Sequence, residues 1–243
     1  MSGATPRGAA NEQEAAAWVR DMFGRVAPRY DLLNHLLSFN IDRHWRARTV
    51  QRLQPVLDRQ DATVIDLCCG TGDLMLALRA KAKARVLGSD FCHPMLTAAK
   101  QKAGVGSPFF EADALKLPIG DRTVDAITVA FGFRNLANYE TGLGELRRVL
   151  KPGGIAAILE FSQPPNPAFN ALYGFYSKNI LPRIGGLISG ASDAYTYLPD
   201  SVRKFPDAPG LAAKMSDAGF RNVQFERMTF GIVALHTGVL AGS

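Results

Sequence analysis

The chain has 243 residues, of which 47% are hydrophobic, and its formal net charge is +6. This length suffices for one domain with a sizeable core. The uninterrupted apolar runs are far shorter than the roughly 20 residues of a membrane-spanning helix, and we expect no signal peptide. The three cysteines and four histidines predict neither a disulfide framework nor a metal site. We therefore expect a protein of the reducing cytoplasm.

The positive charge leaves several classes of partner open. A basic protein can meet nucleic acid or an anionic membrane, or simply carry a solvated surface. No long basic block is interleaved with aromatic residues, so we expect no nucleic-acid partner.

The chain begins with a predicted disordered tail over residues 1–11, which are mostly small and polar. Residues 12–243 are predicted to form one domain, and residues 12–60 its N-terminal helical layer. In this layer hydrophobic residues recur at helical spacing from Trp18 to Val26. Tyr30 follows, and we predict that it faces a ligand, with packing of the layer as the alternative.

The segment VIDLCCGTGD, residues 64–73, indicates how the sheet begins. Apolar residues around Asp66 predict a buried strand, and Gly70 and Gly72 predict a tight turn into a helix that Asp73 can cap. Glycines at such a turn let the backbone approach a ligand closely. A carboxylate at the start of the helix repels a pyrophosphate but suits a cation, such as the sulfonium and ammonium of S-adenosylmethionine.

Two further acids end the next predicted strands. Asp90 ends strand 85–90, where a carboxylate can accept both ribose hydroxyls. Asp113 ends strand 108–113, where it can reach an adenine amino group. With the glycine turn, these acids resemble the class I S-adenosylmethionine methyltransferase pattern. A Rossmann-like dehydrogenase and a related fold that binds nothing remain the alternatives.

The rest of the chain continues to alternate strands and helices. We predict helices over 74–84, 141–150 and 209–218, and strands over 124–131, 155–161, 223–230 and 232–240. This alternation predicts an α/β fold of the class I (Rossmann-like) methyltransferase type, with a mostly parallel seven-stranded sheet, helices on both faces and a closing antiparallel hairpin. Residues 162–206 interrupt it and are predicted to form a helical substrate lid, with ordinary packing of extra helices as the alternative.

Seven segments are similar to the menaquinone and ubiquinone biosynthesis C-methyltransferase family. They are RYDLLNHLLS (29–38), DLCCGTGDL (66–74), FGFRN (131–135), RRVLKPGG (147–154), LPRIGGLISGASDAYTYLPDSVRKFP (181–206), DAGF (217–220) and GIVALHTG (231–238). The similarity extends from about residue 18 to residue 240. FGFRN, the block 181–206 and VALH are specific to this family, whereas the glycine turn and LKPGG are general features of class I methyltransferases.

The resemblance implies methylation of a ring carbon of a polyprenylated quinol with S-adenosylmethionine as cofactor. The substrate is demethylmenaquinol, a methoxy-benzoquinol of the ubiquinone pathway, or both, and we predict demethylmenaquinol. The rival functions are a small-molecule O-methyltransferase and a non-catalytic scaffold. Because a polyprenyl tail lies in the bilayer, we also predict transient contact with an anionic membrane, and a homodimer remains open.

The resemblance also implies cofactor roles for Thr71, Asp90 and Asp113–Ala114. Ala130 stands where some members place a serine, so only its backbone can serve. With the residues of the turn and its neighbours, the predicted cofactor-binding set is Asp66, Gly70, Thr71, Gly72, Asp90, Phe91, Met95, Asp113, Ala114 and Ala130. For Met95 a core position is the alternative.

A quinol carbon becomes nucleophilic when the adjacent hydroxyl loses its proton. We predict that Arg134 stabilises the phenolate and orients a water that takes the ring proton, with a structural ion pair to Glu160 as the alternative. Asn135 is predicted to hydrogen-bond the quinol oxygen. The other predicted site residues are Asp193 and Tyr195 for proton relay, and Tyr30, Phe131 and Tyr197 for substrate contact.

Overall fold

The computed structural model describes residues 3–6, 8–180 and 192–242. Seven strands form one sheet in the order β3-β2-β1-β4-β5-β7-β6. They are β1 (Thr63–Leu67), β2 (Arg85–Asp90), β3 (Phe109–Glu111), β4 (Val124–Ala130), β5 (Leu150–Phe161), β6 (Phe220–Met228) and β7 (Val233–Leu240). The pairs among the first five strands are parallel, and β7 is antiparallel to both β5 and β6. The predicted sheet and its closing hairpin are confirmed.

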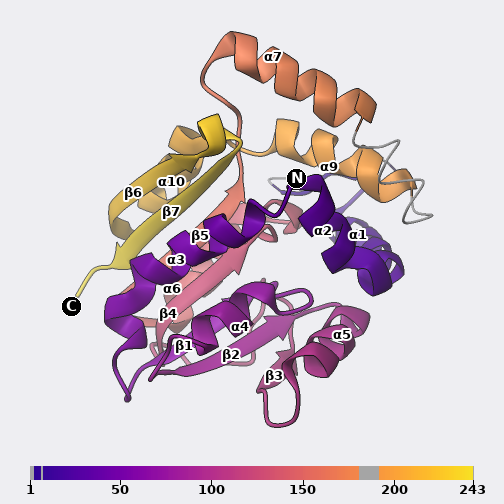
Figure 1. Ribbon diagram of the computed structural model, residues 1–243. Helices are drawn as coiled ribbons and strands as arrows, with labels where there is room; N and C mark the ends of the chain where they lie inside the picture. Colours follow the sequence, from indigo (N-terminus) through magenta and orange to yellow (C-terminus); the bar gives the residue numbers. More distant parts are fainter. Residues whose placement is uncertain (1–2, 7, 181–191, 243) are drawn as a thin grey trace.

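Helices surround this sheet (Figure 1). They are α1 (Glu12–Val26), α2 (Tyr30–Leu37), α3 (Asp42–Leu57), α4 (Asp73–Arg79), α5 (His93–Ala103), α6 (Tyr139–Val149), α7 (Pro167–Phe175), α9 (Ser192–Lys204) and α10 (Ala208–Asp217). Short helices cover Ala27–Arg29, Phe133–Asn135, Tyr176–Ile180 and Thr229–Gly231. No helix in the described part of the chain is both long and apolar enough to cross a membrane.

The core has two layers because β1 is buried on both faces, as expected for a central parallel strand. Val64 packs with α3 and α4, whereas Ile65 and Leu67 pack with α6 and α10. Because β1 pairs in parallel with β2 and β4, the carboxyl ends of these three strands lie at the same edge of the sheet, where ligands bind in folds of this class.

Some predicted boundaries differ from the structure. Helix α4 ends at Arg79 instead of residue 84, because the N–H groups of Lys83 and Ala84 donate to Leu57 O at 2.8 and 3.0 Å. Strand β3 is shorter than 108–113. At the N-terminus, Ala4 is buried and its N–H donates to Leu136 O at 2.7 Å, which differs from the predicted disordered tail.

Residues 162–206 contribute α7 and α9, which lie together at one end of the sheet, beyond α1 and α2 (Figure 1). The insert is helical where the structure describes it, and its role as a substrate lid stays a prediction. The segment LPRIGGLISG and Ala191 lie outside the described residues.

Candidate active site

The turn between β1 and α4 places three residues in the left-handed backbone region. Cys68, Gly70 and Gly72 have φ angles of 52°, 54° and 86°. The Gly70 N–H donates to Asp90 Oδ2 at 2.8 Å and so joins the turn to the end of β2. A Cβ at Gly72 would lie 3.4 Å from the Phe109 ring. Gly72 therefore allows close packing behind the turn, whereas Gly70 faces the Tyr30 ring, which would lie 3.7 Å from a Cβ at that position.

A narrow cavity lies beside this turn, and seven of the predicted cofactor-binding residues line it. They are Gly70, Asp90, Phe91, Met95, Asp113, Ala114 and Ala130. The structure does not bring the other three, Asp66, Thr71 and Gly72, to its lining. Thr71 is buried and its hydroxyl donates to Asp31, so the predicted side-chain contact would require this hydrogen bond to be exchanged.

The two buried acids of this region have unusual acidities. Burial raises the pKa of Asp90 to about 6, although the N–H groups of Cys92 and Gly70 stabilise its charged form. Burial raises the pKa of Asp66 to about 7. Asp66 Oδ1 accepts from the Thr128 hydroxyl at 2.6 Å, while Oδ2 is buried without a hydrogen-bond partner. Desolvated carboxylates of this kind favour a positively charged ligand beside them.

A second, much larger cavity of about 940 Å³ adjoins the first. Its wall comes from α1, α2 and α3 on one side and from α7 and α9 on the other, and most of its lining is apolar. Trp45, Phe131 and Phe161 form an aromatic cluster in this wall, with ring centroids 4.9 to 6.4 Å apart. The cavity therefore suits a large apolar molecule.

Three residues, Phe23, Tyr30 and Phe131, line both cavities. Phe131 has a φ angle of 59°, which is rare for a bulky residue and typical of functional sites. Burial raises the pKa of Tyr30, against the effects of its hydrogen bond to Asn34 and the nearby charge of Arg134. The two cavities thus meet around Tyr30 and Phe131, whose ligand contacts stay a prediction.

Arg134 presents a buried cation to the large cavity. Its Nη1 donates to Glu160 Oε1 at 2.9 Å, and the guanidinium lies 5.3 Å from the centroid of the Phe161 ring. Burial acts against the charged form, but Glu160 outweighs it and the pKa of Arg134 is raised. The predicted alternative, an ion pair with Glu160, is thus present in the structure. This ion pair holds a charged guanidinium at the wall of the cavity.

A hydrogen bond connects Tyr197, in the insert, to Asn135, which lies outside it. The Tyr197 hydroxyl donates to Asn135 Oδ1 at 3.1 Å, and burial raises the pKa of Tyr197 to about 12. Asp193 is placed differently from its predicted relay role: it does not line the cavity, its side chain is 40% exposed, and it pairs with Arg25. The Tyr195 side chain lies outside the described part of the structure.

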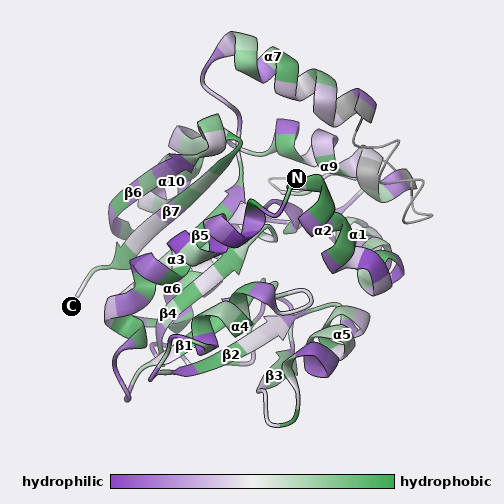
Figure 2. Cartoon of the chain, viewed as in Figure 1, coloured by the Kyte–Doolittle hydropathy of each residue, from purple (hydrophilic) through white to green (hydrophobic). Residues whose placement is uncertain are grey.

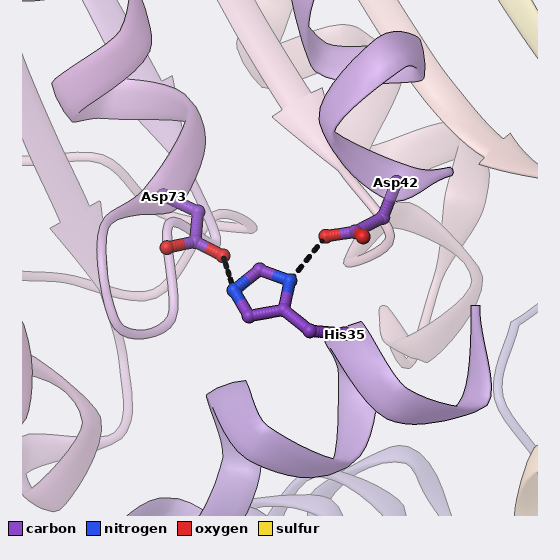
Figure 3. Close-up of side chains that lie close together, drawn as sticks. All are labelled: His35, Asp42 and Asp73. Carbon is purple, nitrogen blue, oxygen red and sulfur yellow. Dashed lines mark hydrogen bonds and ion pairs between the residues drawn. The ribbon is translucent and has the colours of Figure 1, made fainter. Parts of the chain in front are cut away.

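A charged cluster of His35, Asp42 and Asp73 lies beside the large cavity, whose lining includes Asp42 (Figure 3). His35 Nδ1 is 2.8 Å from Asp42 Oδ2, and His35 Nε2 is 3.7 Å from Asp73 Oδ2. Among the described residues these three are the group close enough to share a metal ion, which linear spacing did not indicate. Arg46 pairs with both aspartates, however, and Lys102 pairs with Asp73 at 2.5 Å. Because these cations already pair with the carboxylates, the cluster does not favour a divalent ion.

Sequence reasoning did not assign Trp45, Arg46 or Phe161 to the site. Trp45 and Arg46 are buried in α3 and line the large cavity, and Phe161 ends β5. The one available signal was the helical spacing of apolar residues through α3, which indicates the buried face of that helix. Which parts of that face meet a ligand depends on α2 and α7, which the spacing does not specify.

Known proteins are similar to this chain over almost its whole length. A family model described as the ubiE/COQ5 methyltransferase family matches residues 9–240. A demethylmenaquinone methyltransferase of Thermus thermophilus is 51% identical and covers 89% of this chain and 99% of its own. A ubiquinone/menaquinone biosynthesis C-methyltransferase of Syntrophotalea carbinolica is 45% identical, and the match covers 90% of this chain and 92% of that one.

Solved structures show the same fold at low identity. The methyltransferase bound to the Trm112 activator of Haloferax volcanii has a TM-score of 0.66 at 21% identity and covers 90% of this chain and 97% of that one. A SAM-dependent methyltransferase of Thermotoga maritima has a TM-score of 0.61 at 16% identity, covering 90% and 98%. With the match over residues 9–240 and relatives of up to 51% identity among those compared, the chain belongs to the ubiE/COQ5 methyltransferase family.

Proposed function

We propose that this protein transfers a methyl group from S-adenosylmethionine to a ring carbon of demethylmenaquinol, in menaquinone biosynthesis. The observation that carries this proposal is the pair of adjoining cavities. A narrow one bears buried acids, a large apolar one bears a buried arginine, and Tyr30 and Phe131 line both. A cationic methyl donor and a polyprenylated acceptor are complementary to these two environments.

The residues of the narrow cavity fit the proposed cofactor. Asp90 would hold the ribose and Asp113 the adenine, while Phe91 and Met95 supply apolar contacts. Asp66 Oδ2 is buried without a hydrogen-bond partner close to the turn. A cation nearby would stabilise its negative charge. S-adenosylmethionine supplies an electrophilic methyl group on a sulfonium.

The protein's own contribution to the reaction is positioning and charge. Arg134, held by Glu160, stabilises the phenolate that forms when the quinol loses a hydroxyl proton. Asn135 lines the narrow cavity and is held by Tyr197, and its amide would reach the quinol oxygen at the junction of the two cavities. The guanidinium stays protonated and orients a water that removes the ring proton after transfer. Phe131 and Tyr30 keep bulk water away from the junction.

The isoprenoid tail requires a path into the bilayer. Phe39 and Phe175 line the large cavity and are nevertheless 75% and 60% exposed, and Leu36 and Leu172 are exposed close by in the sequence. These residues lie on or next to α2 and α7, both of which carry hydrophobic segments (Figure 2). We propose that this rim touches an anionic membrane transiently, aided by the net charge of +6.

Vesicle sedimentation tests the membrane contact. Wild type should bind vesicles that contain anionic lipid at low salt, and Phe39→Asp with Phe175→Asp should abolish this binding. Val105→Asp is the matched control, because Val105 is fully exposed in the loop between α5 and β3, at the opposite end from α7 (Figure 1). Equal binding by wild type and the double variant would contradict the proposed rim.

The reaction itself is tested with radiolabelled S-adenosylmethionine and a short-tailed demethylmenaquinol under reducing conditions. A methoxy-benzoquinol is assayed in parallel, and the position of the new methyl group is determined by NMR. Label on a ring carbon of the naphthoquinol supports the proposal, and label in both acceptors extends it to a dual pathway. Label on oxygen, or cofactor binding without transfer, would overturn the quinol C-methylation.

A further inference from the structure

The amino-acid end of S-adenosylmethionine carries a carboxylate, and the narrow cavity offers no cation to pair with it. Asp90 and Asp113 are the charged groups among the described residues of its lining, and both are acidic. A buried carboxylate without a charged partner is unfavourable. We therefore expect a cation for this end of the cofactor just beyond the narrow cavity.

Three arginines line the adjoining large cavity: Arg46, Arg134 and Arg203. Arg203 has a side chain 67% exposed and pairs with Asp200. Arg134 is held by Glu160. Arg46 is nearly buried, and its Nη2 lies 3.1 Å from Asp73 Oδ2. Asp73 directly follows the glycine turn, so Arg46 is the arginine bonded to the residue that opens α4.

The surroundings of Arg46 hold its guanidinium in one orientation. Asp42, one turn earlier on α3, pairs with it on one side, and Asp73 pairs with it on the other. His35 stands between these two aspartates (Figure 3). A guanidinium has five N–H groups, so two ion pairs leave further donors for a ligand. Such preorganisation suits a planar carboxylate.

The charge of the cluster also matches the ligand. Asp31, Asp42 and Asp73 oppose Arg46 and Lys102, and three negative and two positive groups leave one net negative charge when His35 is neutral. S-adenosylmethionine carries two positive groups and one negative group. Its net charge is thus the opposite of that of the cluster.

Tyr30 connects the cluster to the cofactor cavity. Its ring lies 3.7 Å from the position of a Cβ at Gly70, and the charges of both Arg46 and Asp90 act on the pKa of its hydroxyl. The glycine turn, the acid at the end of β2 and the guanidinium therefore surround one side chain. A ligand that extends from Asp90 past Gly70 approaches Arg46.

We propose that Arg46 binds the carboxylate of the amino-acid end of S-adenosylmethionine, and that Asp42 and Asp73 act as positioning residues for its guanidinium. This inference rests on the cofactor of the proposed function. It assigns a cofactor contact to α3, in the N-terminal layer.

A double-mutant cycle between protein and ligand tests it by calorimetry. The two ligands are S-adenosylhomocysteine and its decarboxylated analogue, and the proteins are wild type, Arg46→Gln and Arg48→Gln. A charge-assisted hydrogen bond corresponds to about 10- to 100-fold in affinity. Wild type should bind the analogue more weakly by this factor. Arg46→Gln should bind S-adenosylhomocysteine as weakly as wild type binds the analogue, and should lose nothing further when the carboxylate is removed.

Arg48→Gln is the matched control, since Arg48 lies on the same helix but pairs with Glu226 at 2.9 Å and lines neither cavity. It should behave as wild type toward both ligands. If wild type binds both ligands equally, or if Arg46→Gln discriminates between them as wild type does, the inference is wrong. Failure of wild type to bind S-adenosylhomocysteine at all would overturn the proposed function instead.

Discussion

The most direct test of the site's electrostatics is the substitution Asp66→Asn. Asp66 is fully buried at the end of β1, with one oxygen bonded to Thr128 and the other unpartnered. Asparagine has the same shape and keeps an acceptor for the Thr128 hydroxyl, but it cannot ionise. We expect the variant to stabilise the cofactor-free protein and to weaken binding of S-adenosylmethionine, because the charge that favours the sulfonium is lost.

The size of the effect follows from the shift in pKa. Burial raises the pKa of Asp66 in the folded protein to about 7, against about 3.9 in the unfolded chain. Ionisation therefore opposes folding: the cost is absent below about pH 4 and complete above about pH 7. At about 1.4 kcal/mol for each pKa unit, the cost removed by asparagine is about 4 kcal/mol at pH 8 and about 1 to 2 kcal/mol at pH 5.

Urea unfolding of wild type and variant at pH 5 and pH 8 measures this difference. Asp125→Asn is the control, because the pKa of Asp125 is lowered: burial alone would raise it, but hydrogen bonds from Lys151 and the Thr63 N–H prevail. Asp125→Asn should therefore destabilise the protein at both pH values. A gain from Asp66→Asn that is equal at both pH values, or a loss at pH 8, would refute the reasoning.

Three further predictions concern the cavities and the core. Glu160→Gln removes the buried partner of Arg134 and should cost about 3 to 5 kcal/mol in urea unfolding; an unchanged midpoint would argue against a desolvated pair. Tyr30→Phe keeps the ring that excludes water from the junction, so kcat and the calorimetric affinity for S-adenosylhomocysteine should both stay within about twofold of wild type; a loss of kcat of about tenfold or more would give the hydroxyl a part in the reaction. Phe133→Ala, in a fully buried position, should cost about 3 to 5 kcal/mol, and a loss below about 1 kcal/mol would mean that the core around α6 collapses to fill the space.

The cofactor half of the site was largely predictable from local pattern. In a parallel sheet the glycine turn and the acids after successive strands meet at one edge whatever the rest of the chain does. Gly70, Asp90 and Asp113 follow this rule and line one cavity. Thr71 and Asp66 belong to the same motif but do not line this cavity. The Thr71 hydroxyl donates a hydrogen bond to Asp31, and Asp66 accepts one from the Thr128 hydroxyl. A motif therefore locates a site without specifying which side chains face it.

The substrate half depended on contacts between distant segments. Periodicity indicates that α3 has a buried face, yet only the packing of α2, α7 and α9 makes part of that face a cavity wall. Asp193 was predicted from its place in the insert, but in the structure it pairs with Arg25, which is 168 residues away in the sequence, and it does not line the cavity.

The sequence by itself determined the order of strands and helices, the glycine turn and the family, because these depend on local spacing and backbone preference. Tertiary structure alone decided that Arg134 meets Glu160, that His35 stands between Asp42 and Asp73, and that Tyr30 borders both cavities. Such pairings join residues from separate elements, and their energies depend on burial and distance, which a linear pattern does not contain.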